Sequence, residues 1–307
     1  MRYLVTGGAG FIGSAVVRRV ISLGHEAVVL DDFSTGRDAN LAGLSARVLE
    51  GCVTDPATVR AACAGCDGVF HLAAVASVFK SMEQPVRCHD VNVTGTLNVL
   101  EAARQEKVRR VVLSSSAAVY GEADAFPLSE TVQGEPISPY GLHKKIAEQY
   151  CRLYAAAGWV EAVCLRYFNV YGPRQDPNGE YAAVVPRFIT LGLAGVPLTI
   201  FGDGLQSRDF LFVEDVAEAN VKAMTAAGIS GHAFNVASGR ETSLLDLVAA
   251  IAAALGREVP YRFAAARAGD IRRSVGNGSL ARQEMGFSPA VLLPQGVAAT
   301  LEHFRNE

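Results

Sequence analysis

The sequence predicts an α/β protein with a doubly wound parallel sheet and a smaller C-terminal lobe. Three observations support this prediction. Short β-branched runs alternate with Ala- and Leu-rich segments through the first half of the chain, a glycine-rich turn follows the first run, and the alternation ends after about residue 170. Apolar strands that alternate with amphipathic helices are typical of a parallel sheet that is buried on both faces.

The expected strands are apolar runs at 2–7, 26–32, 46–51, 68–73, 109–116 and 160–170. Helical segments lie between them, such as "SAVVRRVISLG" and "VNVTGTLNVLEAARQEK". One more strand is expected in "HAFNVAS", followed by a last helix over 243–256. These elements together predict a sheet with helices on both faces.

The second half of the chain has a different character. The stretches "YGPRQDPNGEY" and "FGDGLQSRDF" are rich in Gly, Pro and charge, which is typical of loops. We expect residues 1–170 to form the first domain, with a return strand near 213–237. Residues 171–307 are expected to form the smaller lobe over the carboxyl ends of the strands, where ligands of such folds bind.

The composition limits the classes of function that are expected. The chain has 307 residues and a net charge of −3, which gives no sign of a nucleic-acid or membrane partner. "MRYLVTGG" enters a strand at once, which favours a chain without a signal peptide. Cys63 and Cys66 form one C-x-x-C without a second pair or a His cluster, so no metal site is predicted. We expect a cytoplasmic protein in a reducing compartment.

The motif "VTGGAGFIG" predicts a dinucleotide site. Gly8, Gly10 and Gly13 fit G-x-G-x-x-G between a strand and a helix, and Gly7 with Gly10 forms an overlapping G-x-x-G. Small residues let the main chain approach a diphosphate at the helix N-terminus. The second strand ends in Asp31 and Asp32, where an acid can bind a ribose. No Arg replaces that acid, which favours NAD over NADP and predicts a Rossmann domain.

Tyr140 and Lys144 are candidate catalytic residues. They are four residues apart, which places both on one face of a helix. An ammonium near a phenol stabilises the phenolate and lowers the pKa of the tyrosine, so Tyr140 is a candidate base for a hydroxyl. Ser116, at the end of a strand, can hydrogen-bond the same reacting oxygen. A surface Tyr–Lys pair is the alternative when these two residues are taken alone.

With "TGGAGFIG", "HLAA", "SSSAAVYG", "PYGLHKK" and "RYFNVYGPRQ", the chain resembles the extended short-chain dehydrogenase/reductases, and within them the nucleotide-sugar 4-epimerases. The resemblance implies that Tyr140 is the base, Lys144 the phenolate stabiliser and Ser116 its hydroxyl partner. It also implies that residues 1–170 bind NAD and residues 171–307 bind a UDP-sugar. The implied NAD ligands are Gly7, Gly10, Phe11, Ile12, Gly13, Asp31, Asp32, Leu72, Ala73, Ala74, Asn92, Ser114, Tyr140, Lys144 and Tyr167.

The chemistry implied by the resemblance is transient oxidation at C4 of the sugar, rotation of the 4-keto sugar, and reduction on its other face. Dehydratases of this family carry an Asp-Glu pair after the position of Ser116, and UDP-glucuronate decarboxylases carry a Glu. Ala117 and Ala118 stand there instead, which favours epimerisation. A non-catalytic NAD-binding regulator is the alternative from another class, and it would be expected to lose Tyr140 or Lys144.

The resemblance also assigns substrate ligands, and these are Ser116, Tyr140, Asn169, Arg208, Arg267, Asp270 and Ser274. A small residue at Ser274 implies room for an N-acetyl group, so UDP-glucose, UDP-galactose and their N-acetyl counterparts are expected substrates. UDP-glucuronate is the rival: an acid at Asp176 disfavours it, while Arg187 or Arg273 offers a cation. The family implies a homodimer. Cys52 and Ala76 depart from the family pattern and are not expected to be ligands.

Overall fold

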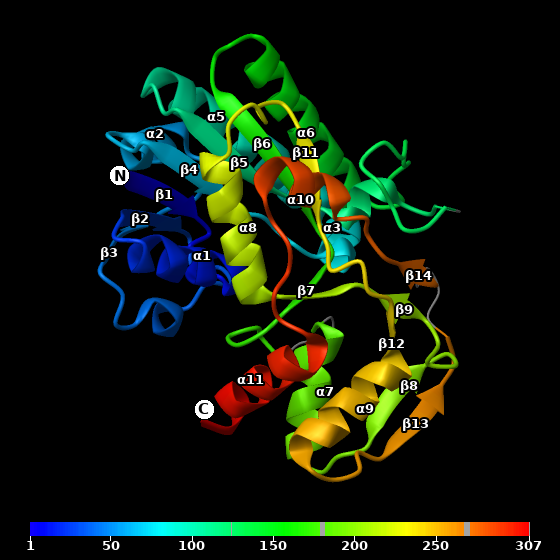
Figure 1. Ribbon diagram of the computed structural model, residues 1–307. Helices are drawn as coiled ribbons and strands as arrows, with labels where there is room; N and C mark the ends of the chain where they lie inside the picture. Colours follow the sequence, from blue (N-terminus) through cyan, green and yellow to red (C-terminus); the bar gives the residue numbers. More distant parts are fainter. Residues whose placement is uncertain (124, 179–181, 267–270, 307) are drawn as a thin grey trace.

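The computed structural model describes residues 1–123, 125–178, 182–266 and 271–306. A large parallel sheet with helices on both faces forms the upper part of Figure 1, and a smaller lobe lies below it. The predicted α/β fold is confirmed.

The large sheet has seven strands in the order β11-β6-β5-β4-β1-β2-β3, all paired in parallel. The strands are β1 (Arg2–Thr6), β2 (Glu26–Asp31), β3 (Ala46–Glu50), β4 (Gly68–His71), β5 (Arg110–Ser116), β6 (Glu161–Tyr167) and β11 (Ala233–Val236). The chain order reverses between β1 and β4, and ligands of doubly wound sheets bind at such a point.

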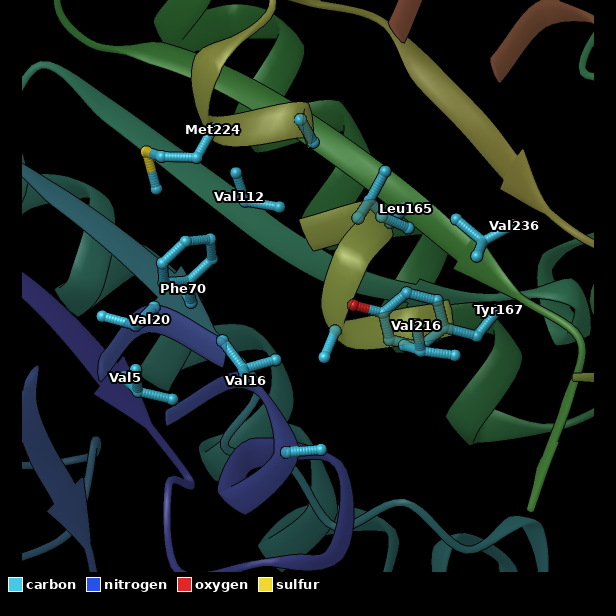
Figure 2. Packing of buried hydrophobic residues seen from close by; sticks show 14 of the residues in the cluster. Val5, Val16, Val20, Phe70, Val112, Leu165, Tyr167, Val216, Met224 and Val236 are labelled. Carbon is cyan, nitrogen blue, oxygen red and sulfur yellow. The ribbon is translucent and has the colours of Figure 1, made fainter. Parts of the chain in front are cut away.

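Helices bury both faces of this sheet. They are α1 (Phe11–Ser22), α2 (Pro56–Cys63), α3 (Val78–Glu83), α4 (Pro85–His89), α5 (Gly95–Gln105), α6 (Pro139–Ala156), α8 (Val213–Thr225) and α10 (Ser279–Met285), with the short turns η1 (Asp38–Leu41), η2 (Asp90–Thr94) and η3 (Ala117–Tyr120). One core lies under α1 and α8, and Figure 2 shows Val16, Val20 and Val216 packed in it. A second core lies under α2, α5 and α6.

The chain returns to the large sheet after its first excursion into the smaller lobe. Helix α8 packs against α1, strand β11 joins the edge of the sheet beside β6, and α10 contacts β11. Ala281 and Met285 of α10 belong to the core under α1 and α8. We propose that the nucleotide domain consists of residues 1–170 together with this returning part of the chain.

The smaller lobe has its own core. Its elements are β7 (Asn169–Tyr171), α7 (Val184–Leu193), β8 (Leu198–Phe201), β9 (Ser207–Arg208), β10 (Phe210–Phe212), β12 (Thr242–Ser243), α9 (Leu244–Leu255), β13 (Tyr261–Ala264), β14 (Arg273–Ser274) and α11 (Leu293–Asn306). Ser243 and Asp246 form a capping box at the start of α9, and Gly256 ends this helix in the left-handed conformation. The structure has α10 and α11 beyond 243–256, so the prediction that this was the last helix is wrong.

Within the described ranges, the helices are too short or too polar to cross a bilayer. All six cysteines are described, and each is a free thiol. Burial raises the pKa of Cys63 to about 12 and that of Cys66 to about 11. The C-x-x-C pair therefore lacks the thiolate character of a redox motif.

Candidate active site

The glycine-rich turn between β1 and α1 leaves an open helix end. Gly7 has a φ of +68°, and a Cβ on it would lie 2.7 Å from the main-chain nitrogen of Ala73. A Cβ on Gly13 would overlap the main-chain oxygen of Gly7. Gly10 is the N-cap of α1 and has no side chain to occupy the free N–H groups. The cradle therefore fits a diphosphate, as NAD requires.

Two carboxylates stand beside this turn. Asp31 accepts hydrogen bonds from the N–H of Ala9 at 2.8 Å and of Phe33 at 2.9 Å, so it also holds the glycine loop against β2. Burial raises the pKa of Asp31 above its usual value. Asp32 accepts from the N–H and the hydroxyl of Ser34. Both acids line the cleft above the turn, where they would repel a ribose 2′-phosphate.

Nearly all the predicted cofactor residues line this cleft. They are Gly7, Gly10, Phe11, Ile12, Gly13, Asp31, Asp32, Leu72, Ala73, Ala74, Ser114, Tyr140, Lys144 and Tyr167. Asn92 is buried behind the wall instead. Its side-chain oxygen accepts from the N–H of Val75 at 2.8 Å, and its nitrogen donates to the oxygen of Val75. Asn92 therefore holds the loop that forms the wall.

The cleft also has lining residues that the motifs did not indicate. They include Ser34, Thr35, Gly51, Val53, Val75, Arg87, Val91 and Ser115. Cys52 and Ala76, which depart from the family pattern, lie in the lining as well. These residues come from the ends of several strands and from α4 and η2, and the periodicity and propensities of the sequence give no signal for such contacts.

Tyr140 and Lys144 lie on the first two turns of α6. Ser138 caps this helix and Pro139 occupies its first position, both of which favour a helix start. The nitrogen of Lys144 is 5.9 Å from the centre of the Tyr140 ring and donates a 2.6 Å hydrogen bond to the oxygen of Ser114. The structure thus brings the predicted pair together at the carboxyl end of β5.

The protonation of this pair differs from the sequence expectation. Burial raises the pKa of Tyr140, and the hydrogen bond with Ser116 opposes that rise without reversing it. Burial also lowers the pKa of Lys144 to about 8. In the protein alone, desolvation has the largest effect on the pKa of Tyr140, and it acts against the lowering that is expected from Lys144.

The hydroxyl oxygen of Ser116 has a main-chain partner. It accepts a 3.1 Å hydrogen bond from the N–H of Ala118, which leaves the hydroxyl proton free to be donated. Ser116 lies near enough to Tyr140 to lower the pKa of the phenol. Ala117 and Ala118, which follow, carry no group that transfers a proton.

A groove between the two lobes meets the cleft at the first turn of α6. Tyr140 lines the cleft, while Ser138 and Ala118 line the groove. Its other described lining residues include Val78, Phe79, Ile137, Asn169, Val184, Arg187, Phe188, Leu191, Thr199, Phe201, Gln206, Arg208, Leu244 and Ile271. Helix α7 opens on the groove with Ala183 as its N-cap, and alanine cannot occupy the free N–H groups there.

The predicted substrate residues are divided by the structure. Asn169 and Arg208 line the groove. Ser274 is half-buried in β14 and is paired with Arg208 of β9, but it is absent from the described groove lining. Arg267 and Asp270 lie outside the described residues.

The structure also shows where the charged residues lie that bear on UDP-glucuronate as a substrate. Asp176 forms an ion pair with Arg37 at 3.2 Å and is absent from the described lining of the groove. Arg273 pairs with Glu241 and stacks on Phe126. Arg187 of α7 lines the groove. The expectation that Asp176 repels a sugar carboxylate therefore lacks a structural basis.

Comparisons with known proteins agree with this geometry. Residues 3–237 match the model of the NAD dependent epimerase/dehydratase family. A UDP-glucose 4-epimerase of Mycolicibacterium smegmatis is 44% identical, over 100% of this chain and 99% of the relative. The structure of Thermotoga maritima UDP-glucose 4-epimerase with UDP-glucose superposes with a TM-score of 0.94 at 37% identity, over 100% of this chain and 99% of the other.

A second solved structure extends the comparison. It is a UDP-N-acetylglucosamine 4-epimerase from Methanobrevibacter ruminantium in complex with UDP-N-acetylmuramic acid, with a TM-score of 0.95 and 34% identity over 99% of this chain and 98% of the other. The resemblance seen in the sequence is confirmed. From its glycine-rich cradle to its paired Tyr140 and Lys144, this chain belongs to the NAD-dependent epimerase/dehydratase family.

Proposed function

We propose that the protein interconverts the C4 epimers of UDP-hexoses with NAD as its cofactor. The substrates are UDP-glucose and UDP-galactose, together with their N-acetyl counterparts. One observation carries the proposal: Tyr140 lies where the cleft meets the groove, with Ser116 near enough to lower its pKa. A base at this junction contacts a ligand in the cleft and another in the groove.

We assign a role in the reaction to each of Tyr140, Ser116 and Lys144. Tyr140 takes the proton from the 4-hydroxyl of the sugar, and Ser116 donates its hydroxyl proton toward the same oxygen. Lys144 supplies the positive charge that the Tyr140 phenolate needs, because burial alone opposes ionisation. The glycine turn and Asp31 of the cleft would hold NAD, which would supply reversible hydride transfer at C4 of the sugar. Tyr140 gives the proton back once the keto sugar has presented its other face.

The groove is suited to a sugar nucleotide that lies between the base and the smaller lobe. Ala118 and Ser138 form the end near Tyr140, which we assign to the sugar. Asn169, Arg208 and the open N-terminus of α7 provide donors for a diphosphate farther along. Arg267 and Asp270 remain part of the proposal from sequence alone.

The test is incubation of the purified protein with separate UDP-sugars, without added reductant, followed by separation of the epimers. Conversion of UDP-glucose to UDP-galactose at equilibrium, with no net change in NADH absorbance, is the expected result. Tyr140→Phe is the matched inactive control. NAD released on denaturation would show that the cofactor is retained through purification.

A second candidate function, epimerisation of UDP-glucuronate, is favoured by Arg187. This cation lines the groove, where it can pair with a sugar carboxylate. Including UDP-glucuronate in the panel tests it. Turnover of that sugar alone, lost in Arg187→Ala, would replace the first proposal. A non-catalytic regulator would convert none of the sugars, although Tyr140 and Lys144 are retained.

We further propose a homodimer formed through α5 and α6. Leu142 and Leu153 of α6, and Trp159 just after it, are about half exposed, at 48%, 55% and 52%. Covering these apolar side chains would favour association. Light scattering should give twice the chain mass, and Leu153→Asp should reduce it. We assign the cytoplasm on the support of the free thiols.

A further inference from the structure

Ser81 of α3 connects two elements of the site. It is fully buried. Its hydroxyl donates a 2.6 Å hydrogen bond to the main-chain oxygen of Val78 and accepts a 3.1 Å hydrogen bond from the main-chain N–H of Tyr140. The hydroxyl therefore links α3, a short helix that borders the groove, to Tyr140, the proposed base.

This contact acts at a point where α6 needs a partner. The first N–H groups of a helix have no acceptor within the helix. Ser138 accepts from Gly141, as a local cap does. The N–H of Tyr140 is satisfied by Ser81, from another helix.

Close packing fixes the same turn at a second point. A Cβ on Gly141 would lie 2.5 Å from the main-chain oxygen of Ala118, two residues after Ser116. The first turn of α6 is thus held at two points, by close packing against Ala118 and by the hydrogen bond to Ser81. The hydrogen bond between Tyr140 and Ser116 depends on this placement.

Helix α3 also forms part of the groove wall. Val78 and Phe79 line the groove and are 42% and 47% exposed. The oxygen of Val78 is the group that accepts from Ser81. A substrate that packs against these side chains would therefore press on the same helix that holds the main chain of Tyr140.

We propose that Ser81 is a positioning residue for the reaction, which fixes the main chain of Tyr140 and so aligns its hydroxyl with Ser116 and with the sugar. This inference rests on the proposed function for its kinetic consequence. The hydrogen bond itself does not depend on that function.

The test compares Ser81→Ala and Ser81→Thr with the wild type. Ala keeps the helix and removes the hydroxyl, whereas Thr keeps the hydroxyl. We expect Ser81→Ala to lower kcat about 10- to 100-fold with little change in KM, because misplacement of a reacting group by about 1 Å costs on that order. The acidic limb of the pH profile, on which Tyr140 loses its proton, should move to higher pH, because Ser116 would lower the pKa of Tyr140 less. Ser81→Thr should recover most of kcat.

Ser77→Ala is the matched control. Ser77 caps α3 by accepting from Lys80, so its loss weakens the same helix without reaching Tyr140. It should leave kcat and the pH profile unchanged. Equal losses in Ser77→Ala and Ser81→Ala would show that stability of α3 is the cause and would overturn the positioning role.

A second measurement separates this inference from the proposed function. Amide hydrogen exchange of Tyr140 in the full chain should be at least tenfold faster in Ser81→Ala than in the wild type, and unchanged in Ser77→Ala. If the wild type converts no UDP-sugar, the proposed function fails. The amide exchange of Tyr140 would still test its hydrogen bond to Ser81. Unchanged exchange, or unchanged kcat in an active protein, would overturn the role of Ser81.

Discussion

The side-chain nitrogen of Lys144 donates a hydrogen bond of 2.6 Å to the main-chain oxygen of Ser114. This contact anchors the lysine to the carboxyl end of β5, two residues before Ser116. The ammonium is buried, so its charge is held near Tyr140 at the expense of its hydration. Burial accordingly lowers the pKa of Lys144 to about 8, although Glu148 opposes the change.

Lys144→Met should stabilise the unliganded protein near neutral pH while abolishing activity. The pKa of Lys144 falls from 10.5 in the unfolded chain to about 8 in the fold, which corresponds to a cost of about 3 kcal/mol below pH 8. Between pH 8 and 10.5 the unfolded chain binds more protons than the folded protein. The free energy of unfolding therefore rises with pH over this range, and the destabilising effect of Lys144 disappears. Urea unfolding should therefore show an advantage of Lys144→Met at pH 7 that shrinks toward pH 10.

Lys145→Met is the control for this experiment. Lys145 is partly exposed and contacts Gly134 and Glu135, so its substitution should not produce the same pH dependence. A Lys144→Met protein that is less stable than the wild type at every pH would contradict the proposed cost.

Tyr140→Phe should abolish turnover and leave UDP-sugar binding nearly intact. The substitution removes the hydroxyl that transfers the proton and preserves the ring beside Lys144. Loss of a general base lowers the rate roughly 100- to 10,000-fold. Titration calorimetry gives the binding constant and epimer separation gives kcat. Tyr150→Phe, on the same helix but outside the described linings of the cleft and groove, should behave as the wild type. Near-normal turnover by Tyr140→Phe would refute the assignment.

Asp31→Ala should weaken NAD binding by about 10-fold or more. It removes both a carboxylate in the cleft and the acceptor for the N–H of Ala9 and Phe33. The wild type should prefer NAD over NADP, because Asp31 and Asp32 repel a 2′-phosphate. Fluorescence titration with both cofactors measures this preference. Asp38→Ala, at an exposed position of η1, is the control. Equal support of the reaction by NADP would contradict the proposed role of Asp31 and Asp32.

The fold and the cofactor cleft could be predicted because their signals are local. The glycine turn, the acid at the end of β2 and the Tyr140–Lys144 spacing each have a physical cause within a few residues. Asn92 is predicted as an NAD ligand, whereas in the structure its side chain is hydrogen-bonded to the main chain of Val75. An amide side chain can bind a ligand or the main chain, and the sequence does not distinguish these two partners.

The groove could not be predicted in the same way. Val78, Phe79 and Arg187 reach it from α3 and α7, which are far apart in the chain and meet through tertiary packing. Helix α11 was missed although Val297 and Leu301 show helical spacing and are buried, because Pro294 and Gly296 in its first turn suggest a loop. The upward effect of burial on the pKa of Tyr140 could not be predicted, because spacing alone does not reveal how far a side chain is desolvated.

Ser274→Tyr should selectively remove activity on the N-acetyl sugars. Ser274 is small and lies beside Arg208, which lines the groove. The family resemblance places this position near the C2 substituent of the sugar, so a phenol ring here should exclude the larger N-acetyl group first. The expected loss in kcat/KM is about 10- to 100-fold for UDP-N-acetylglucosamine, the range that steric discrimination in a pocket allows, with UDP-glucose little changed.

Thr242→Tyr tests whether that loss arises at the sugar or through Arg208. Thr242 pairs with Arg208 from β12, on the other side of β9, so a ring there disturbs the same arginine from the opposite neighbour. If displacement of Arg208 were the cause, both variants would lose activity on all four UDP-sugars, because a diphosphate contact is common to them. The other result is that Ser274→Tyr loses activity only on the two N-acetyl sugars while Thr242→Tyr keeps the selectivity of the wild type. That result would show that Ser274 itself limits the size of the substrate. Equal loss of both sugar classes in Ser274→Tyr would show that this residue does not set substrate size.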